Sequence, residues 1–177
     1  MRGLGTWNAE PTQPAVPKGR TTMWITSPAF EPDSRIPKKH AYRPEGANVS
    51  PPLAWSGAPE GTKELALVCD DPDAPSRANP RPEGPWVHWV VYRIPASQSM
   101  LAEGASGLTE GKNDFGETAW GGPLPPNGSG EHRYVFTIYA LDHELDAGPG
   151  LTKAELLERI EGNVLAQGEL IGTYERR

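Results

Sequence analysis

The sequence has little cysteine, no excess of basic charge and no long apolar run. Cys69 is the only cysteine in 177 residues, which excludes an internal disulfide and is typical of a reducing compartment. Acidic residues outnumber basic residues by 23 to 17, so the overall field disfavours nucleic acid and anionic membranes as partners. No stretch approaches the about 20 apolar residues of a membrane span, and residues 1–20 lack the apolar run of a signal peptide. We therefore expect a cytoplasmic protein without a transmembrane segment.

Glycine and proline are abundant instead, with 20 residues of each. Aromatic and aliphatic residues are nevertheless spread along the chain, so this composition indicates ordered turns and loops rather than a low-complexity tract. The length fits one domain with one hydrophobic core. We predict a flexible N-terminal extension over residues 1–20 and a single domain over residues 21–177.

Three segments have the composition of buried β-strands. Residues 64–70, 86–92 and 132–141 are rich in aromatic and aliphatic residues, many of them β-branched, and turn-forming residues or prolines lie close to their ends. Residues 23–26 form a shorter candidate strand. This pattern predicts a mainly β protein with long proline- and glycine-rich loops.

The helical signal is confined to the C-terminal part of the chain. Thr152 and Glu155 have the spacing of a capping box, in which each side chain binds a free backbone N–H of the first helical turn. Apolar residues then recur at every fourth position as far as Val164. We predict a helix over residues 153–166 and a final strand over residues 170–174.

Two of the predicted strands carry a histidine near their beginning, each after a stiff loop. His88 follows the proline-rich residues 70–85, and His132 follows the glycine- and proline-rich residues 121–130. Glycine lets backbone N–H groups approach a ligand, and proline removes conformational freedom that binding would otherwise freeze out. If both strands belong to one sheet, the two imidazoles line a common hollow that suits a small anion.

Strict alternation of side chains predicts which residues share a face. Within residues 86–92 it places His88 on the same face as Val90 and Tyr92, and on the face opposite Trp89. In residues 132–141 it places His132 and Tyr134 together.

Two aspartates precede the first histidine. A carboxylate close to an imidazole raises its pKa and fixes which ring nitrogen carries the proton. Our hypothesis is that Asp71 and Asp73 keep His88 or His132 as a donor facing the anion. Turn formation is an alternative role for both aspartates, and an ion pair that braces the loop is an alternative role for Arg77.

Several ordered motifs resemble the phosphatidylethanolamine-binding protein family, in particular its bacterial and archaeal Raf-kinase-inhibitor-like branch. They are DPDAP at 71–75 with Arg77, W-x-H at 86–88, GP at 122–123, PP at 125–126 and G-x-HRY at 130–134. The segments NVSPP at 48–52 and LAQGELIGTY at 165–174 are also similar, and the resemblance spans about residues 22–175. Val87 differs from the second histidine that many animal members have, and Leu124 lies in a loop that is often built differently.

The resemblance implies an antiparallel β-sandwich of one large and one small sheet, with a shallow pocket for phosphate-like groups or small carboxylates. Carried over position by position, the ligand-binding residues would be Asp71, Asp73, Pro75, Trp86, His88, Pro126, His132 and Tyr134. A kinase or protease partner is compatible with the resemblance. A homodimer through the predicted helix is a further possibility.

The main prediction is therefore a non-catalytic binding protein for a small phosphate, phosphoester or carboxylate group, with no cofactor and no metal. The alternative is a hydrolase in which a histidine and Asp71 act as general acid and base, although the sequence shows no nucleophile motif and Cys69 lies in a buried strand. A metal site of Asp71, Asp73, His88 and His132 is a weaker alternative, because no closely spaced pair of ligands is present.

Overall fold

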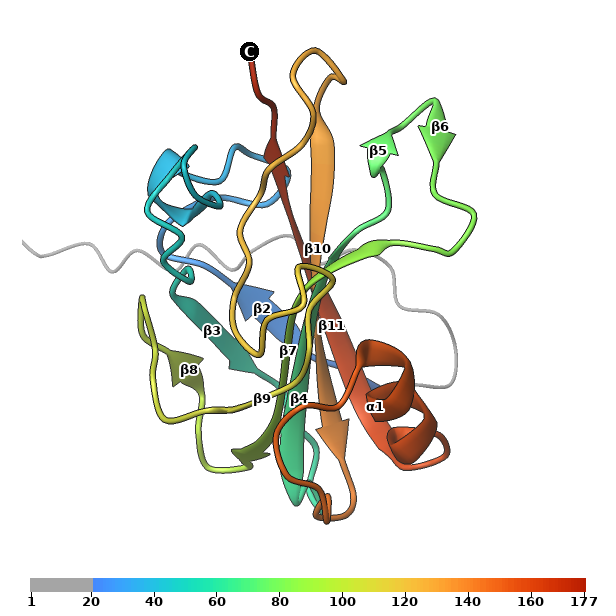
Figure 1. Cartoon of the computed structure of the whole chain (residues 1–177). Helices are drawn as coiled ribbons and strands as arrows, with labels where there is room; N and C mark the ends of the chain where they lie inside the picture. Colours follow the sequence, from blue (N-terminus) through green and yellow to red (C-terminus); the bar gives the residue numbers. More distant parts are fainter. Residues whose placement is uncertain (1–20) are drawn as a thin grey trace, which may run out of the picture.

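The computed structural model describes residues 21–177, and the predicted extension over residues 1–20 lies outside this range. A large sheet of six strands dominates it, in the order β1-β11-β10-β4-β7-β9 (Figure 1). Its strands are β1 (Thr21–Thr22), β4 (Glu64–Asp71), β7 (Trp86–Pro95), β9 (Thr109–Glu110), β10 (His132–Leu141) and β11 (Val164–Tyr174).

A second sheet of three strands has the order β2-β3-β8 and lies beside the large one (Figure 1). Its strands are β2 (Trp24–Thr26), β3 (Leu53–Ser56) and β8 (Met100–Leu101). A two-stranded hairpin of β5 (Pro75–Ser76) and β6 (Asn79–Pro80) stands out from the large sheet, and a 3₁₀ turn covers Lys38–His40. The predicted mainly β fold with one large and one small sheet is confirmed.

Most pairs in the two main sheets are antiparallel, with one exception. The short β1 runs parallel to β11, with Thr21 opposite Ala166. The large sheet is therefore mixed at its edge, whereas its central strands β10, β4 and β7 pair antiparallel as predicted.

The main core fills the space between the two sheets. Leu65, Leu67 and Cys69 of β4 and Phe136 and Ile138 of β10 belong to one buried cluster. The small sheet contributes the buried residues Ile25, Leu53, Trp55 and Leu101 to the same cluster. Cys69 is fully buried, and burial raises the pKa of its thiol, which fits a packing role.

The opposite face of the large sheet is covered by the helix α1 (Lys153–Ile160) (Figure 1). Leu156 and Ile160 of α1 form a second buried cluster with Ala66 and Val68 of β4. The predicted capping box is present, because Thr152 accepts from the Glu155 N–H and Glu155 accepts from the Thr152 N–H.

The predicted length of the helix is wrong. The helix ends at Ile160, and β11 already begins at Val164. Gly162 has φ of 79°, a left-handed conformation that glycine adopts without steric cost and that ends a helix. Val164 is the first residue of β11, and it packs against the same buried cluster as Leu156 and Ile160 of the helix. The spacing of these three apolar residues therefore imitates a longer helix.

Within residues 21–177 no helix has the length and the apolar character that crossing a membrane requires.

Candidate ligand-binding site

A β-bulge brings His88 to the face of the sheet that carries His132. Where β4 pairs with β7, Cys69 faces Trp89 but Asp70 faces Val87, so His88 is an extra residue in the ladder. A bulge of this kind shifts the alternation of side chains by one position. Val87 consequently joins Val90 and Tyr92 in the cluster under α1, and the predicted grouping of His88 with Val90 and Tyr92 is wrong.

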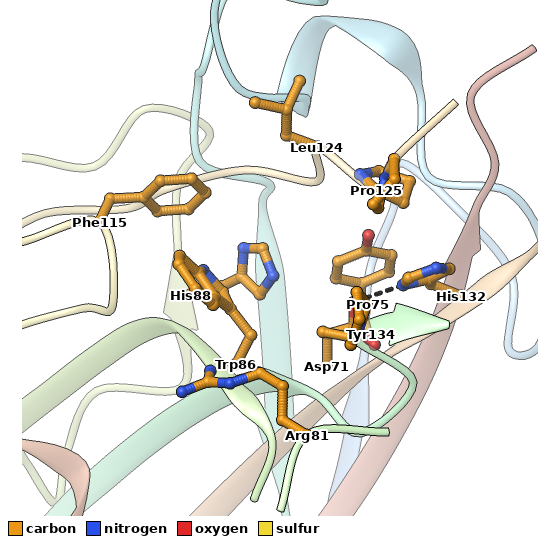
Figure 2. A pocket seen from close by; sticks show the side chains of 12 residues that line it. Asp71, Pro75, Arg81, Trp86, His88, Phe115, Leu124, Pro125, His132 and Tyr134 are labelled. Atoms are coloured by element: carbon orange, nitrogen blue, oxygen red, sulfur yellow. Dashed lines mark hydrogen bonds and ion pairs between the residues drawn. The ribbon is translucent and has the colours of Figure 1, made fainter. Parts of the chain in front are cut away.

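A cavity of about 330 Å³ lies at this end of the large sheet (Figure 2). Its polar or partly polar walls come from Asp71, Arg81, Trp86, His88, His132 and Tyr134. Its apolar walls come from Ala74, Pro75, Phe115, Leu124, Pro125 and Pro126. The structure thus brings seven of the eight predicted site residues to one cavity, and Asp73 is the exception.

Asp71 and His132 form a buried pair at the back of the cavity. The His132 Nδ1 and Asp71 Oδ2 atoms are 2.7 Å apart, and both residues are almost completely buried. The other oxygen of Asp71 accepts from the Asp73 backbone N–H at 2.7 Å, which fixes the orientation of the carboxylate. Asp71 therefore positions His132, as the hypothesis predicts.

The second nitrogen of His132 contacts Ser129. The Ser129 hydroxyl donates to the Pro126 carbonyl at 2.7 Å, which uses its only proton. The same hydroxyl oxygen lies 2.9 Å from His132 Nε2. His132 lines the cavity, and its two nitrogens also contact Asp71 and Ser129.

Asp73 lies behind the cavity and binds arginines. Its carboxylate accepts from Arg133 Nε at 3.0 Å and Nη2 at 2.8 Å, and from the Arg133 backbone N–H at 2.9 Å. Arg77 approaches the same carboxylate at 3.4 Å, so the ion-pair interpretation of Arg77 holds. Burial alone would raise the pKa of Asp73, but these bonds and charges lower it to about 2.

This depressed pKa predicts an acid-sensitive contribution to stability. Because the folded-state pKa of Asp73 is about 2 and the ordinary value is 3.8, the stabilisation is complete above about pH 5 and is lost as the pH falls through 3.8 toward 2. We expect Asp73→Asn to flatten the pH dependence of the unfolding free energy in this window, measured by urea denaturation. Asp33→Asn, at an exposed residue, is the control; equal flattening in both variants would refute the assignment.

His88 is held by a backbone carbonyl rather than by a carboxylate. Its Nδ1 lies 2.6 Å from the Gly121 carbonyl oxygen. Burial, the largest influence, lowers the pKa of His88 despite the opposing effects of the Gly121 carbonyl and of Asp71. The hypothesis that an aspartate holds one of the two histidines therefore applies to His132 and not to His88.

Two donors of the cavity walls have no hydrogen-bond partner among residues 21–177. They are the Tyr134 hydroxyl and the Trp86 Nε1–H, and both atoms are buried. Burial and the nearby Asp71 raise the pKa of Tyr134 well above its ordinary value, so the hydroxyl keeps its proton. Figure 2 shows this hydroxyl pointing toward Pro125, with the ring edge-on to His88 at 5.1 Å between centroids.

Two other wall residues, Arg81 and Phe115, were not predicted from the sequence. Arg81 follows β6, and its Cζ lies 4.9 Å from the centroid of the Trp86 ring. Its Nη1 lies 3.3 Å from Asp114 Oδ2. Phe115 lies in the loop between β9 and β10, and its ring stacks on that of Tyr42 with 4.1 Å between the centroids. Neither belongs to the motifs around the histidines, and the only signal for Arg81 was its position in the proline-rich loop before Trp86.

No metal centre is formed by the described part of the chain. Within residues 21–177 no three histidine, cysteine, aspartate or glutamate side chains are grouped so that they could hold a metal ion. Asp73 is committed to Arg133, and His132 to Asp71 and Ser129, which leaves the residues of the weaker metal alternative already bound to protein groups.

These features define a mainly β protein with a ligand-sized cavity at one end of its large sheet. The family description "Phosphatidylethanolamine-binding protein" matches residues 26–175 of the chain. The chain therefore belongs to the phosphatidylethanolamine-binding protein family, as the motifs indicated.

Similar proteins and solved structures include bacterial and archaeal members. The chain is 44% identical over 161 residues to a UPF0098 protein of Methanothermobacter thermautotrophicus, covering 87% of this chain and 99% of that protein. A phosphatidylethanolamine-binding protein homologue of Chlamydia trachomatis has a TM-score of 0.80 at 42% identity, covering 89% of this chain and 99% of that one. YbcL of E. coli has a TM-score of 0.78 at 33% identity, with 88% and 99% covered.

Proposed function

We propose that the protein is a non-catalytic binding protein for a small molecule that carries a phosphate, phosphoester or carboxylate group. The observation that carries this proposal is the unpartnered, buried hydroxyl of Tyr134 in a wall of the cavity. A buried donor without an acceptor costs about 1–3 kcal/mol, and an oxyanion would remove that cost. The unpartnered Trp86 N–H in the same cavity adds a second donor.

The walls of the cavity define what else the ligand carries. A volume of about 330 Å³ exceeds that of a bare oxyanion and lies at the lower end of the range for small-molecule sites. Pro75, Phe115, Leu124 and Pro125 give much of the wall an apolar character. The ligand is therefore an anionic group joined to an apolar organic group.

Arg81 supplies positive charge at the wall. Its side chain is partly exposed, and its Cζ lies 4.9 Å from the centroid of the Trp86 ring, which also lines the cavity. A ligand oxyanion competes with Asp114 for this guanidinium. The binding free energy that Arg81 contributes therefore depends on the salt concentration.

The hydrogen-bond directions at Ser129 support binding rather than hydrolysis. Ser129, His132 and Asp71 follow one another in the order of a serine hydrolase triad. A nucleophile has to donate its proton to the histidine, whereas the Ser129 hydroxyl donates its proton to the Pro126 carbonyl. A kinase or protease partner and a homodimer stay predictions.

Tyr134→Phe tests the proposed function. We expect phenyl phosphate to bind the variant roughly 10- to 150-fold more weakly, because a hydrogen bond to an anion contributes about 1.5–3 kcal/mol. We also expect the free variant to be as stable as the native protein or more stable, since the lost hydroxyl had no partner. Titration followed by NMR at Tyr134 and His88, and urea denaturation, measure the two effects.

Tyr92→Phe is the matched control. The Tyr92 hydroxyl donates to the Gly148 carbonyl at 2.5 Å, and the residue packs in the cluster under α1 rather than in the cavity. This variant should lose stability and keep the affinity of the native protein. If the native protein shows no change at His88 and Tyr134 with phosphate, phenyl phosphate or citrate, the proposed function is wrong.

A further inference from the structure

Two hydrogen bonds join Gly121 to His88 and fix the imidazole in the cavity wall. The Gly121 carbonyl accepts from His88 Nδ1 at 2.6 Å, and the Gly121 N–H donates to the His88 carbonyl at 2.9 Å. The imidazole stands edge-on to the Tyr134 ring, with 5.1 Å between the centroids, among the side chains drawn in Figure 2. A displacement of Gly121 would therefore displace the His88 ring within the cavity.

The side chain of Asn48 binds the residues on both sides of Gly121. Its Oδ1 accepts from the Gly122 N–H at 2.8 Å, and its Nδ2 donates to the Trp120 carbonyl at 3.3 Å. A backbone N–H can only donate and a carbonyl can only accept, so these two partners fix the orientation of the amide. One side chain thus holds the backbone of residues 120–122.

Asn48 is itself fixed by its own backbone. Its N–H donates to the Ala41 carbonyl at 2.9 Å. Its φ of 56° lies in the left-handed region, which asparagine tolerates better than most residues. The cavity walls described above do not include Asn48, so its effect on a ligand passes through Gly121 and His88.

We propose that Asn48 is a positioning residue of the site, whose amide holds residues 120–122 so that Gly121 keeps His88 in the cavity wall. For its effect on a ligand this inference rests on the proposed function, whereas its effect on His88 is measured in the free protein. An amide donates and accepts at once and so meets both backbone partners, whereas a carboxylate only accepts and glycine offers neither group. The NVSPP segment that contains Asn48 thereby acquires a role at the site.

Asn48→Gly removes the amide without straining the backbone, because glycine adopts the left-handed region at no steric cost. We expect the Nδ1 proton of His88 to exchange with water at least about tenfold faster in this variant, since the carbonyl that binds it is no longer fixed. The Nε1 proton of Trp89, the next residue of β7, binds Glu110 Oε1 at 2.8 Å and is the internal reference. Its exchange rate should stay at the native value, and NMR measures both protons.

Affinity is the second measurement. Phenyl phosphate should bind Asn48→Gly about tenfold more weakly than it binds the native protein, because the contact residue His88 is less well oriented. Asp33→Gly is the matched control, since Asp33 is exposed and also has a left-handed φ, of 60°. Its hydrogen bond to the Ile171 carbonyl uses the backbone N–H, which glycine retains. This control should keep the native affinity and both native exchange rates.

Asn48→Asp distinguishes the two hydrogen bonds of the amide. Its carboxylate still accepts from the Gly122 N–H but cannot donate to the Trp120 carbonyl. We expect the exchange rate of the His88 proton to lie between those of the native protein and Asn48→Gly. Because this variant keeps the shorter of the two bonds, it tests the proposal even if the glycine variant does not fold. An exchange rate equal to that of the native protein would contradict a role for the donor, and one equal to that of Asn48→Gly would contradict a role for the acceptor.

The outcomes separate the inference from the proposed function. Equal acceleration at His88 and Trp89, or none at His88, overturns the inference, because Asn48 would then affect overall stability alone. Unchanged affinity of Asn48→Gly, where the native protein binds phenyl phosphate, also overturns it. If the native protein does not bind phenyl phosphate, the proposed function is wrong, and the exchange rates decide whether Asn48 positions His88. Faster exchange at His88 alone, with weaker binding of phenyl phosphate, supports the inference.

Discussion

Replacement of His132 by alanine is expected to lower the free energy of unfolding by about 3–5 kcal/mol. The substitution leaves the Asp71 carboxylate without its partner at 2.7 Å, in a position where the residue is only 3% exposed. A buried charge without a partner cannot recover its lost hydration, and this is among the largest effects that a single substitution produces. Urea denaturation followed by tryptophan fluorescence measures the loss.

Two further variants distinguish the loss of the Asp71–His132 interaction from the loss of a histidine side chain as such. His143→Ala removes a histidine whose nitrogen lies 3.5 Å from Asp142 with a side chain 35% exposed, and it should change stability by less than about 0.5 kcal/mol. In the double variant Asp71→Ala/His132→Ala the loss should be well below the sum of the two single losses, because the pair couples. Additive losses would show that Asp71 and His132 do not stabilise each other.

Gly122→Ala is expected to lower the free energy of unfolding by more than about 3 kcal/mol, a decrease of roughly 6–12 °C in melting temperature. A Cβ atom at this position would lie 1.9 Å from the His40 carbonyl oxygen and 2.8 Å from two further backbone atoms. Backbone cannot rotate away as a side chain can, so the segment 121–126 has to shift. The same shift pulls the Gly121 carbonyl from His88, so affinity for phenyl phosphate should fall as well.

Gly148→Ala is the matched control for this prediction. Gly148 also has no left-handed backbone, and a Cβ atom there would meet no atom within 4 Å. Its carbonyl, which accepts from Tyr92, is retained in the variant. We expect a change of less than about 0.5 kcal/mol. Similar free energies of unfolding for the two glycine variants would mean that the close approach of residues 121–126 to residues 40–42 is not required for stability.

The strands could be predicted because their signal is local. Residues 64–70, 86–92 and 132–141 carry aromatic and aliphatic side chains in unbroken runs, and the structure has a strand at each. The capping box was predictable for the same reason, since both of its bonds join Thr152 to Glu155. The end of the helix was not, because apolar spacing cannot distinguish another helical turn from a tight turn at Gly162 followed by a strand.

The candidate site was predictable as a set of residues but not as a set of hydrogen bonds. The motifs named seven residues that reach the cavity, yet they paired Asp73 with a histidine instead of Arg133 and did not reveal that the Gly121 carbonyl holds His88. Each of these errors concerns a bond between segments far apart in the chain. Arg133 lies 60 positions from Asp73, and the Gly121 carbonyl lies 33 positions from His88.

The amino-acid sequence by itself determined the strands, the helix start, the stiff loops and the family, because these depend on local propensity and on ordered motifs. Only the tertiary structure decided what the pocket presents. The extra residue in the pairing of β4 with β7 moved His88 to the face of His132, and strict alternation cannot reveal a bulge. Contacts between distant segments then placed the Gly121 carbonyl against His88 and left the Tyr134 hydroxyl and the Trp86 Nε1–H without a partner among residues 21–177, because a polar group's remaining capacity depends on which partners the fold brings to it.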